Sequence, residues 1–172
     1  MKKIIIAALL ATSSTYTFAE DFFTINGKKI SLHEQQSSMI AKLGKPTSSS
    51  NGRISWDANN ISLISATFSK WGIDGLDTSK GSFTINGKTI TIGKDTPNTV
   101  KSKMDNYCHQ FDNGNTNRMS MQAARVGAEG EIYISFYANG SGNTSDKKLL
   151  NTPIDSIKLS YEDPLYEPKC NY

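Results

Sequence analysis

The sequence holds only two histidines and two cysteines among its 172 residues, and these low counts restrict its chemistry. It contains no Gly-x-Ser-x-Gly, His-Glu-x-x-His or phosphate-binding glycine motif, and it nominates no base that could activate a nucleophile. His33 closes the first predicted hairpin and His109 follows Cys108 at a predicted helix end, where a lone histidine is usually a surface or capping residue. The sequence therefore predicts no catalytic residue, with an enzyme of unrecognised type as an open alternative.

A bilayer-spanning apolar run is missing at the amino terminus. The run Ile4–Ala11 is too short to cross a membrane, and it follows the basic residues Lys2 and Lys3. Small residues at Thr17 and Ala19 complete the pattern of a secretory signal peptide cleaved after Ala19. A retained membrane anchor is the rival interpretation, and the absence of a nearby cysteine argues against a lipoprotein. We expect a bacterial protein that is periplasmic or secreted.

The mature chain also lacks a large excess of basic over acidic residues, once the expected signal peptide is removed. The mature chain would have 153 residues with 17 Lys and Arg against 16 Asp and Glu, a net charge near +1. Proteins that bind nucleic acid normally carry a basic patch, so we expect no nucleic-acid partner. The length is sufficient for one domain or two small ones.

The two cysteines, Cys108 and Cys170, are predicted to form a disulfide in an oxidising compartment. Closing a loop of this length would stabilise the fold by roughly 4 kcal/mol in the chain-entropy model. The bond would tie the C-terminal tail to the end of the predicted second helix. A redox or metal pair is the alternative, and the sequence has no Cys-x-x-Cys to favour it.

The motif Phe-Thr-Ile-Asn-Gly-Lys occurs twice, at Phe23–Lys28 and 60 positions later at Phe83–Lys88. Asn-Gly between alternating apolar residues predicts a type I′ hairpin, since both residues tolerate positive φ. An internal repeat indicates a duplicated module. We therefore expect an α+β fold of two tandem modules, residues 20–81 and 82–172, each with a hairpin, one helix packed on a sheet and antiparallel strands. The modules could join their edges into one longer sheet or sit side by side.

Apolar periodicity predicts the remaining elements. Helices are expected at 34–43 and 97–108, the second after the N-cap Thr96. Strands are expected at 53–57, 61–68, 118–126, 131–137 and 154–161, with polar loops at 47–52, 111–117 and 139–148. The glycine-containing segment 69–82 is predicted to be a connector, and the tail 163–172 to be irregular.

The motif Met39-Ile40-x-x-Leu43-Gly44-x-Pro46, followed after a polar gap by Trp56, is similar to a pattern of small bacterial envelope modules. These include small outer-membrane-assembly lipoproteins and the β-lactamase inhibitory proteins, which use an antiparallel sheet to bind other proteins. The hairpin motif resembles a bacterial family of candidate toxin-immunity proteins. The resemblance covers residues 22–68 and, through the hairpin, 83–107, where Lys103-Met104 replaces Leu43-Gly44. It offers no catalytic residue to transfer.

This resemblance implies a non-enzymatic protein that binds and occludes a toxin or an enzyme, as immunity and inhibitor proteins do. The alternative is a scaffold that holds another periplasmic or outer-membrane protein. The expected partner is in either case a protein, and no cofactor is expected.

The candidate protein-binding residues are Trp71 with its neighbours Lys70 and Asp74, and the strand residues Tyr133 and Tyr137. Tryptophan and tyrosine are enriched at interface hot spots. The tyrosines alternate with an apolar strand face, which predicts that they lie on the exposed face of the sheet. The alternatives are that Trp71 closes the core between the modules and that the tyrosines are ordinary strand residues.

Two segments rich in Asp, Asn and Gly, 74–81 and 112–117, carry oxygen ligands of the kind that calcium prefers. Neither has the spacing of an EF-hand loop or a closing glutamate. Solvated turns explain both segments better, so we expect no metal ion.

Overall fold

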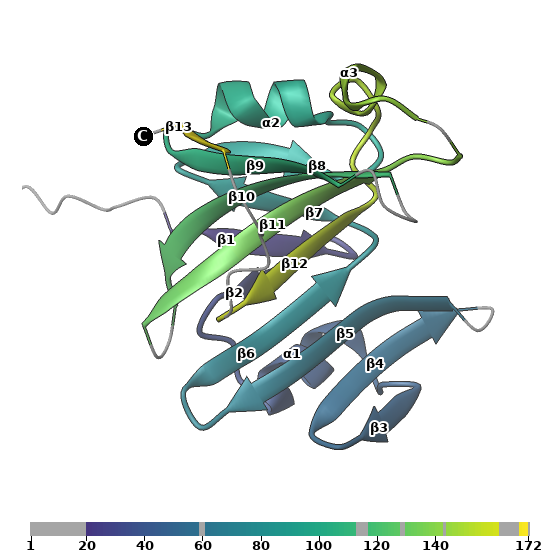
Figure 1. The fold of residues 1–172 in the computed structure, drawn as a ribbon. Coiled ribbons are helices and arrows are strands. Elements are labelled where there is room, and N and C mark those ends of the chain that lie inside the picture. Colours follow the sequence, from purple (N-terminus) through teal and green to yellow (C-terminus); the bar gives the residue numbers. More distant parts are fainter. Residues whose placement is uncertain are drawn as a thin grey trace, which may run out of the picture.

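The computed structural model describes residues 20–58, 61–112, 117–127, 130–142, 144–161 and 169–171. Within these ranges strands dominate, in two antiparallel sheets, and three short helices accompany them (Figure 1). The coarse expectation of a mixed fold of helices and sheets is met. None of the described helices is long and apolar enough to cross a membrane.

The repeated motif forms two hairpins, and together they make the smaller sheet, of four strands in the order β2-β1-β7-β8. Their bounds are β1 Phe22–Ile25, β2 Lys28–Ser31, β7 Ser82–Ile85 and β8 Lys88–Thr91. Asn26 and Gly27 have φ of 51° and 73°, and Asn86 and Gly87 have 49° and 75°. Positive φ at both central positions is what a type I′ turn requires, so the hairpin prediction is confirmed.

The larger sheet has nine strands in the order β13-β9-β10-β11-β12-β6-β5-β4-β3. Their bounds are β3 Ser48–Ser50, β4 Arg53–Ala58, β5 Ile61–Ser69, β6 Gly72–Thr78, β9 Tyr107–Asp112, β10 Arg118–Val126, β11 Glu131–Asn139, β12 Ser156–Ser160 and β13 Lys169–Asn171. The two halves of the chain meet where β6 pairs with β12, with Asp77 opposite Lys158. Of the two arrangements left open, the structure therefore shows joined edges.

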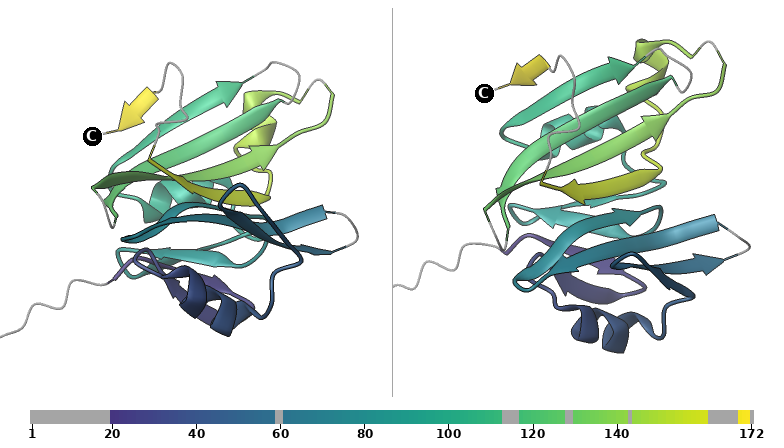
Figure 2. Two further views of the ribbon diagram at one scale, coloured as in Figure 1. Left: turned by 90° about the horizontal axis from the view of Figure 1, so that it is seen from below. Right: turned by 60° about the horizontal axis from the view of Figure 1, so that its bottom comes forward.

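The small sheet covers one face of the large sheet, and the helices α1 (Gln36–Leu43) and α2 (Pro97–Lys103) lie on the same side (Figures 1 and 2). The core lies between these layers. Phe23 and Phe83 are fully buried with ring centroids 4.7 Å apart, and Phe136 of β11 lies 6.2 Å from Phe83. Burial of three large aromatic rings from both sheets holds the layers together.

The end of α1 explains the Leu-Gly-x-Pro-gap-Trp pattern. Gly44, at the C-cap, has a φ of 88°, a positive value that glycine adopts without steric cost. The indole Nε1–H of Trp56 donates to the Gly44 carbonyl at 2.9 Å. Trp56 is 8% exposed, which confirms it as a core residue. Its indole thus satisfies a carbonyl at the end of α1 and docks the helix on β4.

Five sequence predictions about elements are wrong. The segment 69–82 contains β6, whose glycines and central bulge obscure the alternation of its buried residues. The second helix ends at Lys103, and Met104 is already extended. Cys108 therefore lies on β9, not on the helix. The polar loop 47–52 includes β3, and the tail returns as β13, because main-chain pairing at sheet edges needs no apolar pattern. A short helix, α3 (Asp146–Leu149), lies partly in the loop predicted at 139–148.

The predicted disulfide is present. Cys108 and Cys170 are joined, with an S–S distance of 2.04 Å, and they face each other in register across β9 and β13. The bond fixes β13 as the edge strand of the large sheet, and a stable disulfide fits an oxidising, extracytoplasmic compartment. Residues 1–19, with the expected signal peptide, lie outside the described ranges.

Candidate functional site

Trp71, the predicted interface tryptophan, lies in the turn between β5 and β6 and is 56% exposed. Its backbone N–H donates to the Ser69 hydroxyl at 3.1 Å, and the Lys70 ammonium lies 4.8 Å from its ring centre. A cation at this distance is attracted to the negative face of the indole. The alternative that Trp71 closes the core is wrong, because a residue in that role would be buried.

Val126, at the end of β10, is 80% exposed and is with Trp71 one of two large hydrophobic residues exposed in the described chain. The strands run antiparallel in the order β10-β11-β12-β6-β5, so the turns after β10 and after β5 lie at the same end of the sheet (Figure 1). Neighbouring strands are about 4.8 Å apart, which separates the two turns by about 14 Å. We call this end, marked by Trp71 and Val126, the turn end.

The two candidate tyrosines do not lie on an open sheet face as expected. Tyr133 is half-buried, and its hydroxyl donates to the Glu131 carboxylate at 2.7 Å. Tyr137 is 7% exposed, and the Arg118 guanidinium lies 4.8 Å from its ring centre. Ser135, between them on the same face of β11, is fully buried. The expectation of an exposed face is therefore wrong at Tyr137, which offers little surface to a partner.

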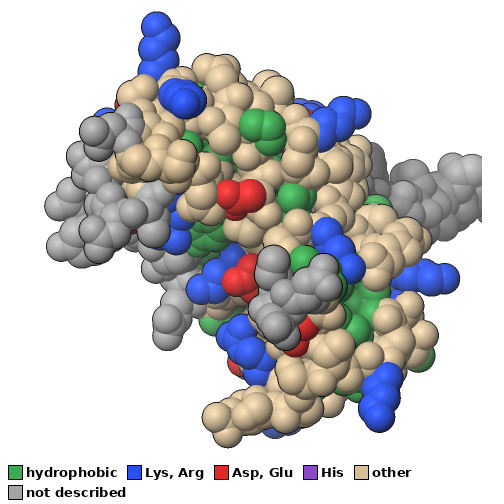
Figure 3. Space-filling view, turned by 90° about the vertical axis from the view of Figure 1, so that its right-hand side faces the viewer, with side chains coloured by type: hydrophobic (Ala, Val, Ile, Leu, Met, Phe, Trp, Pro, Cys, Tyr) green, Lys and Arg blue, Asp and Glu red, His purple; other side chains and the backbone are tan. Residues whose placement is uncertain are grey.

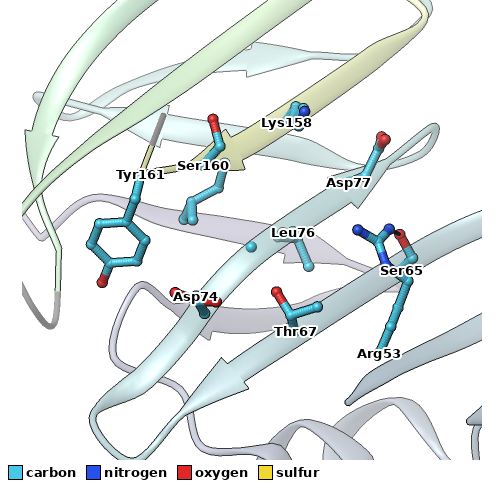
Figure 4. Close-up of a pocket in the computed structure, with 11 residues that line it drawn as sticks. Arg53, Ser65, Thr67, Asp74, Leu76, Asp77, Lys158, Ser160 and Tyr161 are labelled. Atoms are coloured by element: carbon cyan, nitrogen blue, oxygen red, sulfur yellow. Dashed lines mark hydrogen bonds between the residues drawn. The ribbon is translucent and has the colours of Figure 1, made fainter. Parts of the chain in front are cut away.

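Asp74 faces a hollow of about 540 Å³ on the outward face of the large sheet, opposite the small sheet (Figure 4). Polar side chains dominate its lining: Arg53 from β4, Ser65 and Thr67 from β5, Asp74 and Asp77 from β6, and Lys158 from β12. The hollow thus spans the junction between the two halves of the chain, and we call it the junction hollow.

The backbone of β6 creates the junction hollow. Thr67 pairs with Gly75 and Phe68 with Ile73, so Asp74 is the extra residue of a β-bulge. Bulges redirect side chains and recur next to functional sites. Gly75 lies close against Thr67, because a Cβ there would be 2.8 Å from the Thr67 hydroxyl oxygen. The bulge and the glycine together place Asp74 and Asp77 on the same outward face.

The junction hollow contains charges of both signs. Arg53 Nη1 donates to the Ser65 hydroxyl at 2.8 Å. Asp77 and Lys158 are opposite each other in register, yet no ion pair joins them in the described structure. Burial in the hollow raises the pKa of Asp77, and attraction to Lys158 and Arg53 opposes that rise only in part. Asp77 is an exposed residue, so this dehydration is incomplete.

The histidines and the two segments considered for calcium show no grouped metal ligands in the part of the chain that the structure describes. His109 lies on β9, and burial, reinforced by Lys101 and Lys169, lowers its pKa, so it is neutral at pH 7. Across the described ranges no three His, Cys, Asp or Glu side chains are grouped as metal ligands. Residues 74–78 are part of β6 and so do not form the expected turn. Most of the segment 112–117 lies outside the described residues.

The sequence pointed to Asp74 as a neighbour of Trp71 and to Asp77 only within the segment 74–81, and it missed Arg53 and Lys158. These residues come from three strands and are brought together by long-range pairing, which no local pattern shows. One signal was available: Gly75 interrupts an otherwise apolar and polar alternation, and glycine inside a strand often marks a bulge or an open approach.

None of the protein-family models, curated proteins or solved structures compared with this chain matches it. Its resemblances to envelope modules and to candidate immunity proteins therefore stay predictions.

Proposed function

We propose that this protein is a periplasmic, non-enzymatic module, built by duplication, that binds another protein and blocks it by occlusion. A toxin or an enzyme is the expected target, as for the immunity and inhibitor proteins that the sequence resembles. The observation that carries the proposal is the exposed Trp71 at the turn end. An inhibitor of this kind needs a rigid surface and no reaction chemistry of its own.

The turn end supports this role through its exposed apolar side chains. Trp71 and Val126 lie about three strand spacings apart on turns that the sheet holds in place. Exposed tryptophans with a neighbouring cation are typical anchors of protein interfaces. An interface of about 800 Å² per partner would readily include both turns. By contrast, the face in Figure 3 shows hydrophobic side chains only as small separate spots, which favours the turn end over that face.

The test is capture of partners from periplasm with the tagged mature protein, residues 20–172, analysed by mass spectrometry. We expect one stoichiometric partner with a toxin or hydrolase domain, and we expect Trp71→Ala to lose it. Lys147→Ala, in α3 at the opposite end of the sheet, is the matched control and should retain it. Equal capture by Trp71→Ala would refute the turn end as the contact. A dominant envelope-assembly partner would favour the scaffold alternative.

A further inference from the structure

The junction hollow brings charged side chains from three strands around one concave surface. Its floor is the main chain at Gly75, and its walls carry the side chains of Arg53, Asp74, Asp77 and Lys158. In the described structure no hydrogen bond or ion pair occupies the carboxylates of Asp74 and Asp77 or the Lys158 ammonium, so they are open to a ligand. A volume of about 540 Å³ is comparable with small-molecule sites, which measure roughly 300–1,000 Å³.

We propose that the junction hollow binds a neutral, polyhydroxylated ligand, a short oligosaccharide. Trp71 does not line the hollow, and this proposal does not depend on the proposed protein partner. Three properties of the hollow favour this ligand class. They are its balance of positive and negative charge, the free-energy cost of dehydrating its charged side chains, and its hydrogen-bond donors and acceptors.

The balance of charge disfavours simple ions. Arg53 and Lys158 contribute two positive charges, and Asp74 and Asp77 contribute two negative charges. An anion attracted to the cations would meet Asp77, which lies between them and interacts with both. A cation attracted to Asp77 would meet Lys158 and Arg53. For a bound ion, the attraction to one pair of charges and the repulsion from the other pair largely cancel. Each of the four side chains can still form a directed hydrogen bond.

Dehydration disfavours an apolar ligand. Covering these four charged groups with apolar atoms would remove water from them without supplying hydrogen bonds, which costs several kcal/mol for each charge. Asp77 lines the hollow as an exposed residue, and desolvation by the walls raises its pKa. A suitable ligand must therefore replace water with hydroxyl groups and can retain bridging waters.

A saccharide meets these requirements, because each hydroxyl both donates and accepts hydrogen bonds. Asp74 and Asp77 would accept from sugar hydroxyls, while Arg53 and Lys158 would donate to them. The hydroxyls of Ser65 and Thr67 can act in either sense. Gly75 lines the hollow without a side chain of its own, so a sugar ring there would meet main chain beside the Thr67 hydroxyl.

The experiment is a titration of ¹⁵N-labelled mature protein, followed in two-dimensional ¹H–¹⁵N spectra. Maltotriose, cellotriose, mannotriose and triacetylchitotriose are each added to about 10 mM. We expect at least one to shift the amides of Thr67, Gly75 and Lys158 saturably, with a dissociation constant of about 1 mM or lower. If none of the four shifts these amides, or if the shifts lie elsewhere, the proposal is overturned.

The sugar affinity of variants, and its dependence on salt, distinguish a specific binding site from weak surface association. Gly75→Val fills the hollow, and Asp77→Ala removes an acceptor without changing the main chain; each should weaken binding at least tenfold. Ser48→Val, on the exposed edge strand β3, is the control and should bind normally. Salt of about 0.5 M should not change the affinity, because the ligand is uncharged. Unchanged binding by Asp77→Ala, or stronger shifts with acetate or methylguanidinium than with any sugar, would overturn the assignment.

Discussion

The Lys42 ammonium lies 2.6 Å from the Glu34 carboxylate, whose side chain is 6% exposed. The carboxylate also accepts from the Ser38 hydroxyl and from the Ser31 N–H, and Lys42 donates to the Lys29 carbonyl at 2.9 Å. Hairpin β1–β2 and helix α1 are therefore joined through one buried carboxylate. We call this arrangement the carboxylate clamp.

The second half of the chain repeats the carboxylate clamp. Lys103 lies 2.6 Å from Asp95, whose side chain is 10% exposed, and it donates to the Thr89 carbonyl at 2.6 Å. Asp95 accepts from the Thr99 hydroxyl at 3.0 Å and from the Thr91 N–H at 2.7 Å. Both clamps use an acid, a hydroxyl and a lysine at positions i, i+4 and i+8. Two clamps with the same connections support the duplication proposed above.

Loss of one lysine should destabilise the fold through the carboxylate left behind. Lys42→Ala is expected to lower the free energy of unfolding by about 1–3 kcal/mol, because a buried acceptor loses its strongest donor. Urea unfolding measures the change. Lys45→Ala, an exposed residue just beyond the same helix, is the control and should stay within about 0.5 kcal/mol of the parent. Equal stability of the two variants would contradict a structural role for the clamp.

The clamps also predict how stability depends on pH. Burial alone would raise the pKa of Glu34 and of Asp95, but hydrogen bonds, from the clamp lysine above all, outweigh burial and lower both from their ordinary 4.5 and 3.8. The unfolded chain then binds more protons at acid pH, so the clamp contribution is complete above these values and is lost as pH falls through the lower folded values.

We therefore expect Glu34 and Asp95 to change the urea concentration at the unfolding midpoint little between about pH 7 and pH 5. At pH values below about 4, protonation of these two groups should lower that urea concentration. The double variant Glu34→Gln, Asp95→Asn should be less stable at pH 7 and should show a shallower acid decline. A decline of the same slope in the parent and in the double variant would show that other groups control acid unfolding.

Local chemistry made part of the fold predictable. Asn26-Gly27 and Asn86-Gly87 specify their turns by themselves, and Thr96 with Pro97 marks the start of α2. Neither clamp was predicted, and their correspondence is hidden because the offset between the copies changes from 60 in the hairpins to 61 at Glu34 and Asp95. That single inserted residue breaks a fixed-offset alignment, although the i, i+4, i+8 pattern was readable in both copies.

Long-range pairing made the rest unpredictable. Asp77 and Lys158 are far apart in sequence, and nothing local specifies that β6 pairs with β12. The burial of Tyr137 is a similar case, since alternation along β11 gives the face of a residue but not what covers that face. The exposed Trp71, by contrast, could be inferred from a short glycine-containing turn. Candidate residues within one turn were therefore accessible to sequence reasoning, and a site assembled from four strands was not.

Asp77 should reduce the stability of the free protein. A carboxyl group with a raised pKa in the folded state favours folding when it is protonated, so its ionised form at neutral pH is unfavourable. Asp77→Asn is expected to stabilise the protein by less than about 1 kcal/mol at pH 7, since solvent screens an exposed group, and the gain should vanish at acid pH. Thermal melting at both pH values measures it. Lower stability of Asp77→Asn at pH 7 would show that Asp77 is held by favourable contacts instead.

Reduction of the disulfide should destabilise the protein mainly through its unfolded state. The bond closes a sequence separation of 62 residues, and opening such a loop costs roughly 4 kcal/mol in the chain-entropy model. Few native contacts depend on β13, a three-residue strand that is exposed throughout. We therefore expect the double variant Cys108→Ser, Cys170→Ser to fold, with the same ¹H–¹⁵N amide signals as the parent in the other strands. It should unfold at a clearly lower urea concentration. The parent in reductant should match the variant, and reductant should not affect the variant itself. If the parent in reductant lost the signals of β9 and β10 as well, β13 would be required for the native sheet and the unfolded-state account would be wrong.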